Sequence, residues 1–209
     1  MYRHILIVFL SATLMACEDP SIRIDQLDPA IQGTFIDTDS LVVLDEMIDG
    51  INDNITLVND SLAVIDSLEI AGDPTDYTEE IDALNSLLDD LQADRTELNT
   101  QRNEVSRGNI LIDVITATGA PKEIIFTESQ PTYRLPLDPA GNITQFEIRY
   151  NGEIHTALFS YSTDTVFINR TVRILAKNII LGRTSYDSAR FSCDTLECSS
   201  INAKAIFYM

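Results

Sequence analysis

Residues 41–65 read LVVLDEMIDGINDNITLVNDSLAVI, and this stretch decides the fold. Its apolar residues recur at alternating steps of three and four, the heptad pattern of a helix that packs along one seam. The seam positions of this first run are Leu41, Leu44, Ile48, Ile51, Ile55, Val58, Leu62 and Ile65. No step of the pattern is missed, so we expect an unbroken helix of about seven turns.

A second heptad run follows after a break. Residues 71–77, AGDPTDY, contain Gly72 and Pro74, which end the first helix. Asp76 with Glu79 predicts a capping box for the next helix. Residues 81–105 then place seam residues at Ile81, Leu84, Leu88, Leu91, Arg95, Leu98, Arg102 and Val105, and Gly108 ends the run.

The two runs are mirror-spaced about residue 73. If the chain folds back there, each seam residue of the first run faces one of the second whose number makes the sum 146, as Val58 does with Leu88. All eight pairs obey this rule. We therefore predict a long antiparallel two-helix coiled-coil hairpin over residues 40–108. A single parallel coiled coil of several chains would have to carry its helix through Pro74.

Two arginines occupy seam positions in the half of the hairpin away from the turn. Arg95 and Arg102 can lay their stems on Ile51 and Leu44 and reach out to an acid of the first helix. The acids in reach are Asp45, Asp49 and Asp53. The alternative is a device that fixes the register or a contact with a partner.

A further apolar stripe on the first helix, Val43, Leu57 and Val64, points away from the seam. A lone two-helix hairpin is marginal in water, so we expect this stripe to pack on something. The two occupants considered are the C-terminal region and another copy of the chain, which would make a homo-oligomer.

Beyond Gly108 the helical period gives way to short β-branched and aromatic runs. Residues 144–161 alternate apolar and polar side chains about Asn151-Gly152, which predicts a β-hairpin with a type I′ turn. Further strands are expected at 110–116, 122–127, 165–169, 172–181 and 203–209. Turn residues every eight to twelve positions predict an all-β, sandwich-like domain over residues 109–209, so the fold class is α+β.

The first residues, MYRHILIVFLSATLMAC, have a basic start, an apolar run of about eleven residues and a small residue before Cys17. A bilayer-spanning helix needs about twenty apolar residues, so this is a segment to be removed. Leu14-Met15-Ala16-Cys17 resembles the lipobox of bacterial lipoproteins. That resemblance implies a signal peptide over residues 1–16, acylation of Cys17 (palmitate among the chains) and a flexible tether over residues 17–39; the alternative is an ordinary signal peptide.

Glu18 and Asp19 resemble the acid-rich export signal of surface lipoproteins in one group of Gram-negative bacteria. The resemblance implies a lipid-anchored protein of the outer membrane that faces the cell exterior, with the periplasmic face as the alternative. Asp-Ser/Thr-apolar tripeptides, which resemble O-glycan acceptors of the same group, begin at Asp39, Asp60, Asp66, Asp164, Asp187 and Asp194. Chance in a chain rich in Asp and Ser explains these tripeptides equally well.

The net charge of −19 is uneven along the chain. Residues 18–107 hold 23 acidic and 4 basic residues, whereas residues 108–209 are nearly neutral. So acidic a surface repels phosphate backbones, which excludes nucleic acid as a partner. The acids are more typical of a solvated helical face than of a cation site.

Cys193 and Cys198 remain after Cys17 is assigned to lipid. In an oxidising compartment this even pair predicts a disulfide across a tight loop, with free thiols as the alternative. No histidine lies near them, so zinc is not expected.

We find no arrangement of residues in the sequence that specifies a reaction, a metal or a cofactor. His155 could act as a base and Glu147 with Glu153 as a carboxylate pair, but these residues are better explained as ordinary sheet and surface residues. There is no phosphate loop, Cys-x-x-Cys pair or calcium loop. A weak candidate for sugar binding is an aromatic platform of Tyr133, Tyr150, Phe159 and Tyr161.

The sequence thus predicts a lipid-anchored cell-envelope protein with a non-enzymatic structural or binding role. The alternative is a carbohydrate- or peptide-binding module of a surface uptake system, whose partner would be a glycan or an envelope protein. A hydrolase is the third and weakest hypothesis.

Overall fold

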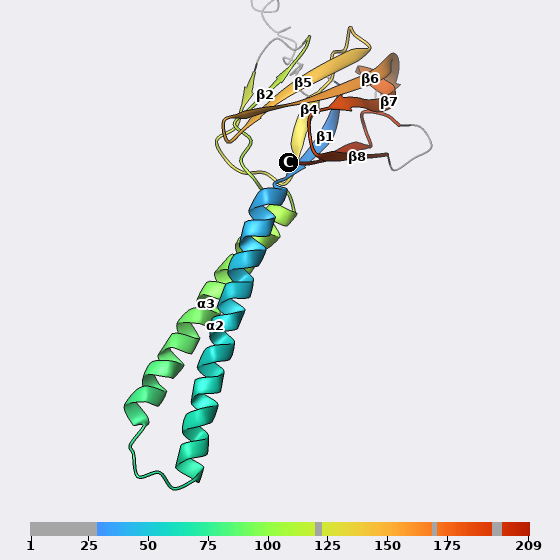
Figure 1. Cartoon of the computed structure of the whole chain (residues 1–209). Helices are drawn as coiled ribbons and strands as arrows, with labels where there is room; N and C mark the ends of the chain where they lie inside the picture. Colours follow the sequence, from blue (N-terminus) through green and yellow to red (C-terminus); the bar gives the residue numbers. More distant parts are fainter. Residues whose placement is uncertain (1–28, 120–122, 169–170, 194–197) are drawn as a thin grey trace, which may run out of the picture.

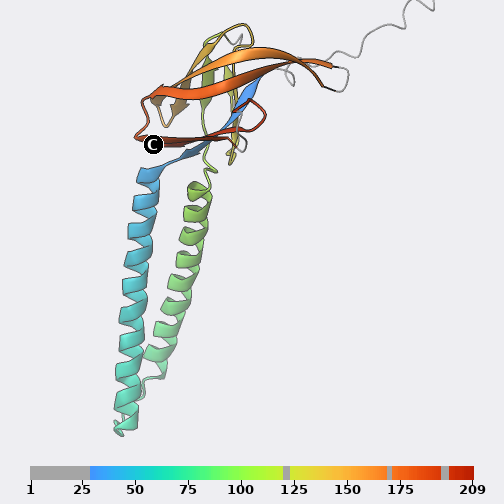
Figure 2. The same cartoon turned by 90° about the vertical axis from the view of Figure 1, so that its right-hand side faces the viewer.

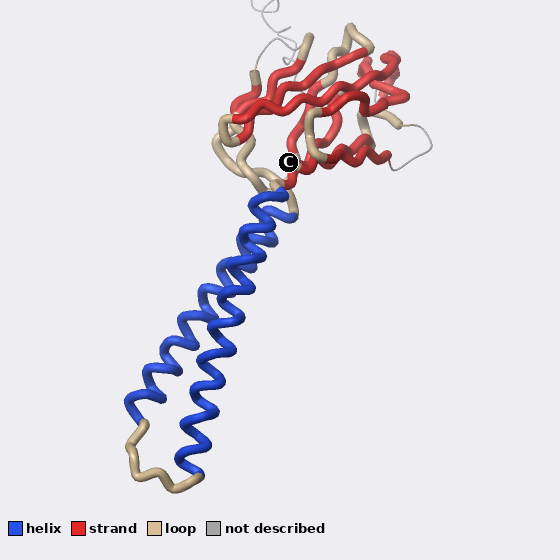
Figure 3. Tube along the Cα trace, viewed as in Figure 1, coloured by secondary structure: helices blue, strands red, loops and turns tan. Residues whose placement is uncertain are grey.

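The structure is a computed structural model that describes residues 29–119, 123–168, 171–193 and 198–209. Two long helices project together from a β region, which makes an α+β fold (Figures 1 and 3). The signal peptide and Cys17 lie outside the described residues. So do the Asp-Thr-Leu site at 194–196 and the first part of the predicted tether.

The two helices run side by side in opposite directions (Figures 1 and 2). They are α2 (Thr38–Ile70) and α3 (Thr78–Ser106). Gly72 and Gly108 adopt positive φ just after the helix ends, as the sequence predicts. Residues 38–106, comprising α2, the connection 71–77 and α3, are called the helix pair below.

The predicted capping box at the start of α3 does not form. The carboxylate of Asp76 accepts from the backbone N–H of Thr78 at 3.1 Å and from its hydroxyl at 2.6 Å. Asp76 therefore closes a local turn two residues long, and the N-cap residue is Tyr77, whose side chain makes no capping hydrogen bond. At α2 the cap is Asp37, whose carboxylate accepts from the backbone N–H of Ser40 at 2.8 Å.

All sixteen predicted seam residues are buried or half-buried. Val58, at 6% exposure, is the most buried residue of the helix pair's apolar seam. Arg102 forms an ion pair with Asp45, one of the three acids predicted for it. Arg95 instead donates to the side-chain oxygen of Asn52 at 3.4 Å. The seam is thus the inner face of the helix pair.

The β region contains two sheets. One has the order β4-β1-β9-β8, and its strands are β1 (Ala30–Ile36), β4 (Tyr133–Pro136), β8 (Ser188–Cys193) and β9 (Ala203–Tyr208). The other has the order β3-β2-β5-β6-β7, and its strands are β2 (Val114–Ala117), β3 (Ile124–Ile125), β5 (Ile143–Tyr150), β6 (Glu153–Ile168) and β7 (Thr171–Thr184). Neighbouring strands are antiparallel except β1 and β9, which are parallel.

One hydrophobic core joins the two sheets. Phe35 of β1 stacks on Phe207 of β9 with ring centroids 5.1 Å apart. Phe207 in turn contacts Phe159 of β6, in the other sheet, edge to face at 6.5 Å. Edge-to-face and offset aromatic pairs add favourable energy to the area that they bury. The core is therefore aromatic in its centre.

The predicted tether over residues 17–39 is wrong over residues 30–39. Residues 30–36 form β1, and Phe35 is fully buried. The chain thus completes a strand of the β region, leaves it through the helix pair and returns at β2. Met209 secures the junction, because its carbonyl accepts from the backbone N–H of Thr38 at 2.8 Å and its own N–H donates to Ile36 at 2.9 Å.

The predicted β-hairpin is confirmed. Asn151 and Gly152 have φ of 49° and 84°, which is the type I′ geometry, and they join β5 to β6. The separate strand expected at 165–169 is a continuation of β6. Besides β1, two strands of the β region were not predicted, β4 and β8. The first ends at Pro136 and forms a sheet edge, which is where proline is tolerated.

Candidate functional site

The predicted aromatic platform does not form. Tyr133 and Phe159 are fully buried and Tyr161 is 6% exposed. The hydroxyl of Tyr133 accepts from the backbone N–H of Ile112 at 3.1 Å. Since a sugar platform needs exposed ring faces, these residues are core. Alternation along the strands predicts which residues share a face, and here that face is the inner one.

Tyr150, the fourth member of the predicted platform, lies at the junction of sheet and helix. Its hydroxyl donates to Asp37 at 2.7 Å, and the hydroxyl of Ser40 donates to the same carboxylate at 2.6 Å. Burial acts to raise the pKa of Asp37, but hydrogen bonds from Ser40 and Tyr150 outweigh it and the pKa is lowered. Burial, with the neighbouring Asp37 carboxylate, raises the pKa of Tyr150. This charge-assisted network fixes the start of α2 to β5.

The carboxylates of Glu147 and Glu153 do not form a catalytic pair. Directly opposed residues in an antiparallel ladder share one face of the sheet. Glu147 is opposed by Thr156, whereas Glu153 is opposed by Tyr150. Since Glu147 and Tyr150 lie three residues apart on β5, they project to opposite faces. Glu147 and Glu153 are therefore separated by the sheet.

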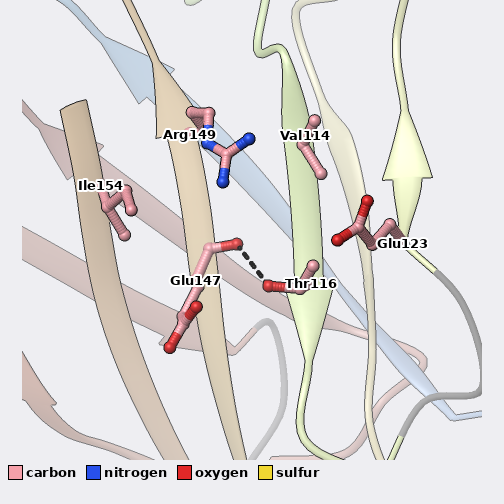
Figure 4. A pocket seen from close by; sticks show the side chains of 6 residues that line it. All are labelled: Val114, Thr116, Glu123, Glu147, Arg149 and Ile154. Carbon is pink, nitrogen blue, oxygen red and sulfur yellow. Dashed lines mark hydrogen bonds between the residues drawn. The ribbon is translucent and has the colours of Figure 1, made fainter. Parts of the chain in front are cut away.

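Glu147 instead lines a shallow hollow of about 70 Å³ on the sheet surface (Figure 4). Its neighbours there are Val114 and Thr116 of β2, Arg149 of β5, Ile154 of β6 and Glu123. The hydroxyl of Thr116 donates to the backbone carbonyl of Glu147 at 3.3 Å. A hollow of this volume has room for about two waters.

The ring of His155 lies beside the side chains of Tyr186 and Glu153. Its ring stacks on Tyr186, with centroids 4.8 Å apart and planes 12° from parallel. Its Nε2 lies 3.7 Å from a carboxylate oxygen of Glu153. The buried hydroxyl of Tyr186 has no hydrogen-bond partner in the described residues, so the imidazole is not placed to take its proton.

Cys193 and Cys198 lie at disulfide distance, with Cα atoms 5.3 Å apart. Both are half-buried against the core. Closing so small a ring constrains the unfolded chain by only about 2 kcal/mol. We therefore expect reduction to lower the melting temperature only slightly, and the oxidised protein to be two protons lighter by mass spectrometry. A large fall in melting temperature on adding reductant would contradict a purely local role for this pair.

A row of exposed apolar side chains follows one face of α2. Leu57 is 63% exposed, Val64 59% and Val43 54%. At the root of the helix pair this row meets a mostly apolar groove of about 670 Å³. The groove is lined by Asp39, Ser40, Val43, Leu44, Thr100, Gln101, Glu104 and Val105. Within the described residues, the row is thus covered by neither sheet.

The described ranges contain no candidate for the other classes of site. Their histidine, cysteine and acidic side chains form no group of three that could hold a metal ion. Within those same ranges, neither helix combines the length and hydropathy needed to cross a bilayer. Comparison of the chain with family models, curated proteins and solved structures finds no match. The exposed face of α2 is therefore the candidate functional site.

Proposed function

We propose that this chain is a lipid-anchored protein of the cell envelope, in which the β region is a base and the helix pair is a projecting arm. The observation that carries the proposal is the direction of β1. The strand runs toward α2, so Ala30, the end nearer to Cys17, lies at the far end of β1 from the helices. An anchor at Cys17 would therefore enter the β region on the side away from the arm (Figure 2).

The arm has the dimensions of a spacer. A helix of 33 residues, as α2 is, extends about 50 Å at 1.5 Å per residue. We interpret the helix pair as an antiparallel coiled coil. We interpret the two sheets, which share the aromatic core, as a sandwich. With the β region anchored to a membrane through Cys17, the tip of the arm, residues 71–77, is held away from that membrane. The outer membrane with the arm facing the exterior is the location that residues 14–19 favour.

The role we propose is binding without catalysis. The separation of Glu147 from Glu153 by the sheet supports it, as do the ring and carboxylate beside His155. A peptide or protein partner suits the chain better than a glycan, because three of the four aromatic residues of the predicted sugar platform are buried. This favours the peptide-binding form of the alternative role, in a surface uptake system.

Replacing Cys17 by Ala tests the anchor. We expect the Cys17→Ala chain to leave the membrane fraction of cells, because one residue carries all the acyl chains. The measurement is fractionation followed by immunoblotting, with the wild-type chain as control. Retention of Cys17→Ala in the membrane fraction, at the wild-type level, would contradict lipid anchoring.

External protease tests the side of the membrane. We expect protease added to intact cells to cut the wild-type chain, and the same protease to leave a periplasmic marker uncut. Protection of the chain in intact cells, with cleavage after the outer membrane is opened, would place it on the periplasmic face.

A further inference from the structure

The exposed face of α2 follows its own heptad pattern. Steps of three and four lead through Val43, Met47, Gly50, Asn54, Leu57, Ser61, Val64 and Leu68, which are called the α2 stripe below. No position in it carries a charge. All of its large apolar members are exposed, from 37% at Leu68 to 63% at Leu57. A second uncharged heptad seam on a helix is typical of a helix that packs against two others.

Gly50 lies in the middle of the stripe. Nothing lies within 4 Å of the position that a Cβ would occupy there. A glycine inside a helix costs about 0.5–1 kcal/mol relative to alanine. No packing within the described chain accounts for this cost. A bare backbone position does allow a second helix to approach α2 closely.

Acidic rows border the stripe on both sides. On α2 the row is Glu46, Asp53 and Asp60, each three residues after one stripe position and four residues before another. On α3, Glu104 lines the same groove as Val43 and therefore shares its face. Steps of seven along α3 from Glu104 lead to Glu97 and Asp90.

A second copy of this chain would not complement these rows. Residues 38–106 hold 18 acidic and only two basic residues. The two bases are Arg95 and Arg102, which are at the seam and contact Asn52 and Asp45. Two α2 stripes in contact would bring acids against acids, and like charges across an interface oppose association.

We propose that the α2 stripe is the docking surface for a basic amphipathic helix of another protein. That helix has an apolar stripe at steps of three and four, with Lys or Arg on both sides of it. Its apolar residues bury the α2 stripe and its cations pair with the two acidic rows. This is the groove-and-helix mode of recognition with charge complementarity at its edges. The inference does not depend on the lipid anchor.

The probe is a synthetic helical peptide of about three heptads with Leu along its stripe and Lys at its flanks. We expect calorimetric titration to show that it binds the full chain, and that added salt weakens the binding. A peptide with the same Leu residues and Glu at the flanks should not bind. Equal binding of the two peptides, or no binding of the Lys peptide, overturns the proposal.

Adjacent valines provide a matched control for the surface. Val42 and Val43 are 57% and 54% exposed, but only Val43 belongs to the stripe. We expect Val43→Asn and Leu57→Asn each to weaken binding of the Lys peptide about tenfold, the equivalent of ~1.4 kcal/mol. Gly50→Leu should weaken it as well, because the added side chain blocks close approach. Val42→Asn should leave the dissociation constant unchanged, and equal losses at Val42 and Val43 would overturn the assignment of the surface.

The mass of the chain in solution, measured without peptide, tests whether a second copy of the chain covers the α2 stripe. We expect sedimentation to give a monomer at concentrations where the Lys peptide binds. A dimer that Val64→Asp converts to a monomer would show that a second copy covers the stripe. It would overturn the basic-helix proposal in favour of the homo-oligomer, one of the two alternatives that the sequence leaves open.

Discussion

Replacing Phe35 by Ala is expected to lower the free energy of unfolding of the β region by about 3–5 kcal/mol. Phe35 is fully buried in β1 and its ring contacts those of Tyr133, Tyr186 and Phe207. Truncation removes these ring contacts and leaves a cavity that a close-packed interior fills only in part. Losses of this size approach the whole stability of a typical domain.

The effect of Phe35→Ala distinguishes two structures for residues 30–36, a buried strand and a solvated tether. If residues 30–36 were tether, Phe35 would be solvated and its loss would cost almost nothing. The control is Phe167→Ala on β6, where the same ring is 79% exposed and little should change. The measurement is denaturant unfolding followed by tyrosine fluorescence. This signal reports on the β region, because five of the chain's seven tyrosines lie in its strands or between them: Tyr133, Tyr150, Tyr161, Tyr186 and Tyr208. Equal midpoints for Phe35→Ala and the parent would contradict the placement of β1 in the core.

The helix pair could be predicted from the sequence because its contacts are local and periodic. A heptad seam needs only the spacing of residues along each helix, and the mirror spacing about residue 73 adds the direction of the second helix. The same holds for the turn at Asn151-Gly152, since two adjacent residues that tolerate positive φ specify it. In each case the deciding residues lie within one short stretch.

β1 could not be predicted in the same way. It is seven residues long, contains Gly33, and pairs with β9, so that Gln32 is opposed by Lys204. No pattern within residues 30–36 reports a partner 172 positions away, as that pairing requires. Two prolines and a glycine in residues 18–39 favoured a tether instead. β8, which joins the same sheet on the other side of β9, has a similarly weak signal.

The candidate site was visible in the sequence only in part. The sequence predicts an outward stripe of three residues, Val43, Leu57 and Val64. The exposed stripe of the structure also contains Met47, Gly50, Asn54, Ser61 and Leu68. The heptad steps from Val43 contain this information. What the sequence lacks is the exposure of the stripe, because the chain could equally have folded a sheet against it. The projection of the helix pair from the β region excludes that cover within the described residues (Figure 1).

Replacing Val58 by Asp is expected to melt the helix pair while the β region stays folded. Val58 is 6% exposed on the seam, so the substitution loses its apolar burial and places an unpaired carboxylate there, at a cost of roughly 3 kcal/mol or more. A pair of two helices is only marginally stable. The side chains around Val58 on the seam are apolar or acidic, so they provide no cation to pair with the new carboxylate. Because the helix pair shares few contacts with the sheets beyond its root, its unfolding need not unfold them.

The matched control for Val58→Asp is Val64→Asp, the same change six residues along the same helix at a side chain that is 59% exposed. We expect circular dichroism at 222 nm to show early loss of helix for Val58→Asp and a near-parental melting curve for Val64→Asp. Tyrosine fluorescence should change late in both variants, since Phe35 and its neighbours are untouched. If the two variants melted alike, the seam would not be the face that holds the helices together. If helix and fluorescence were lost together in Val58→Asp, the arm and the base would form one cooperative unit, and the arm could not serve as a spacer that is independent of its base.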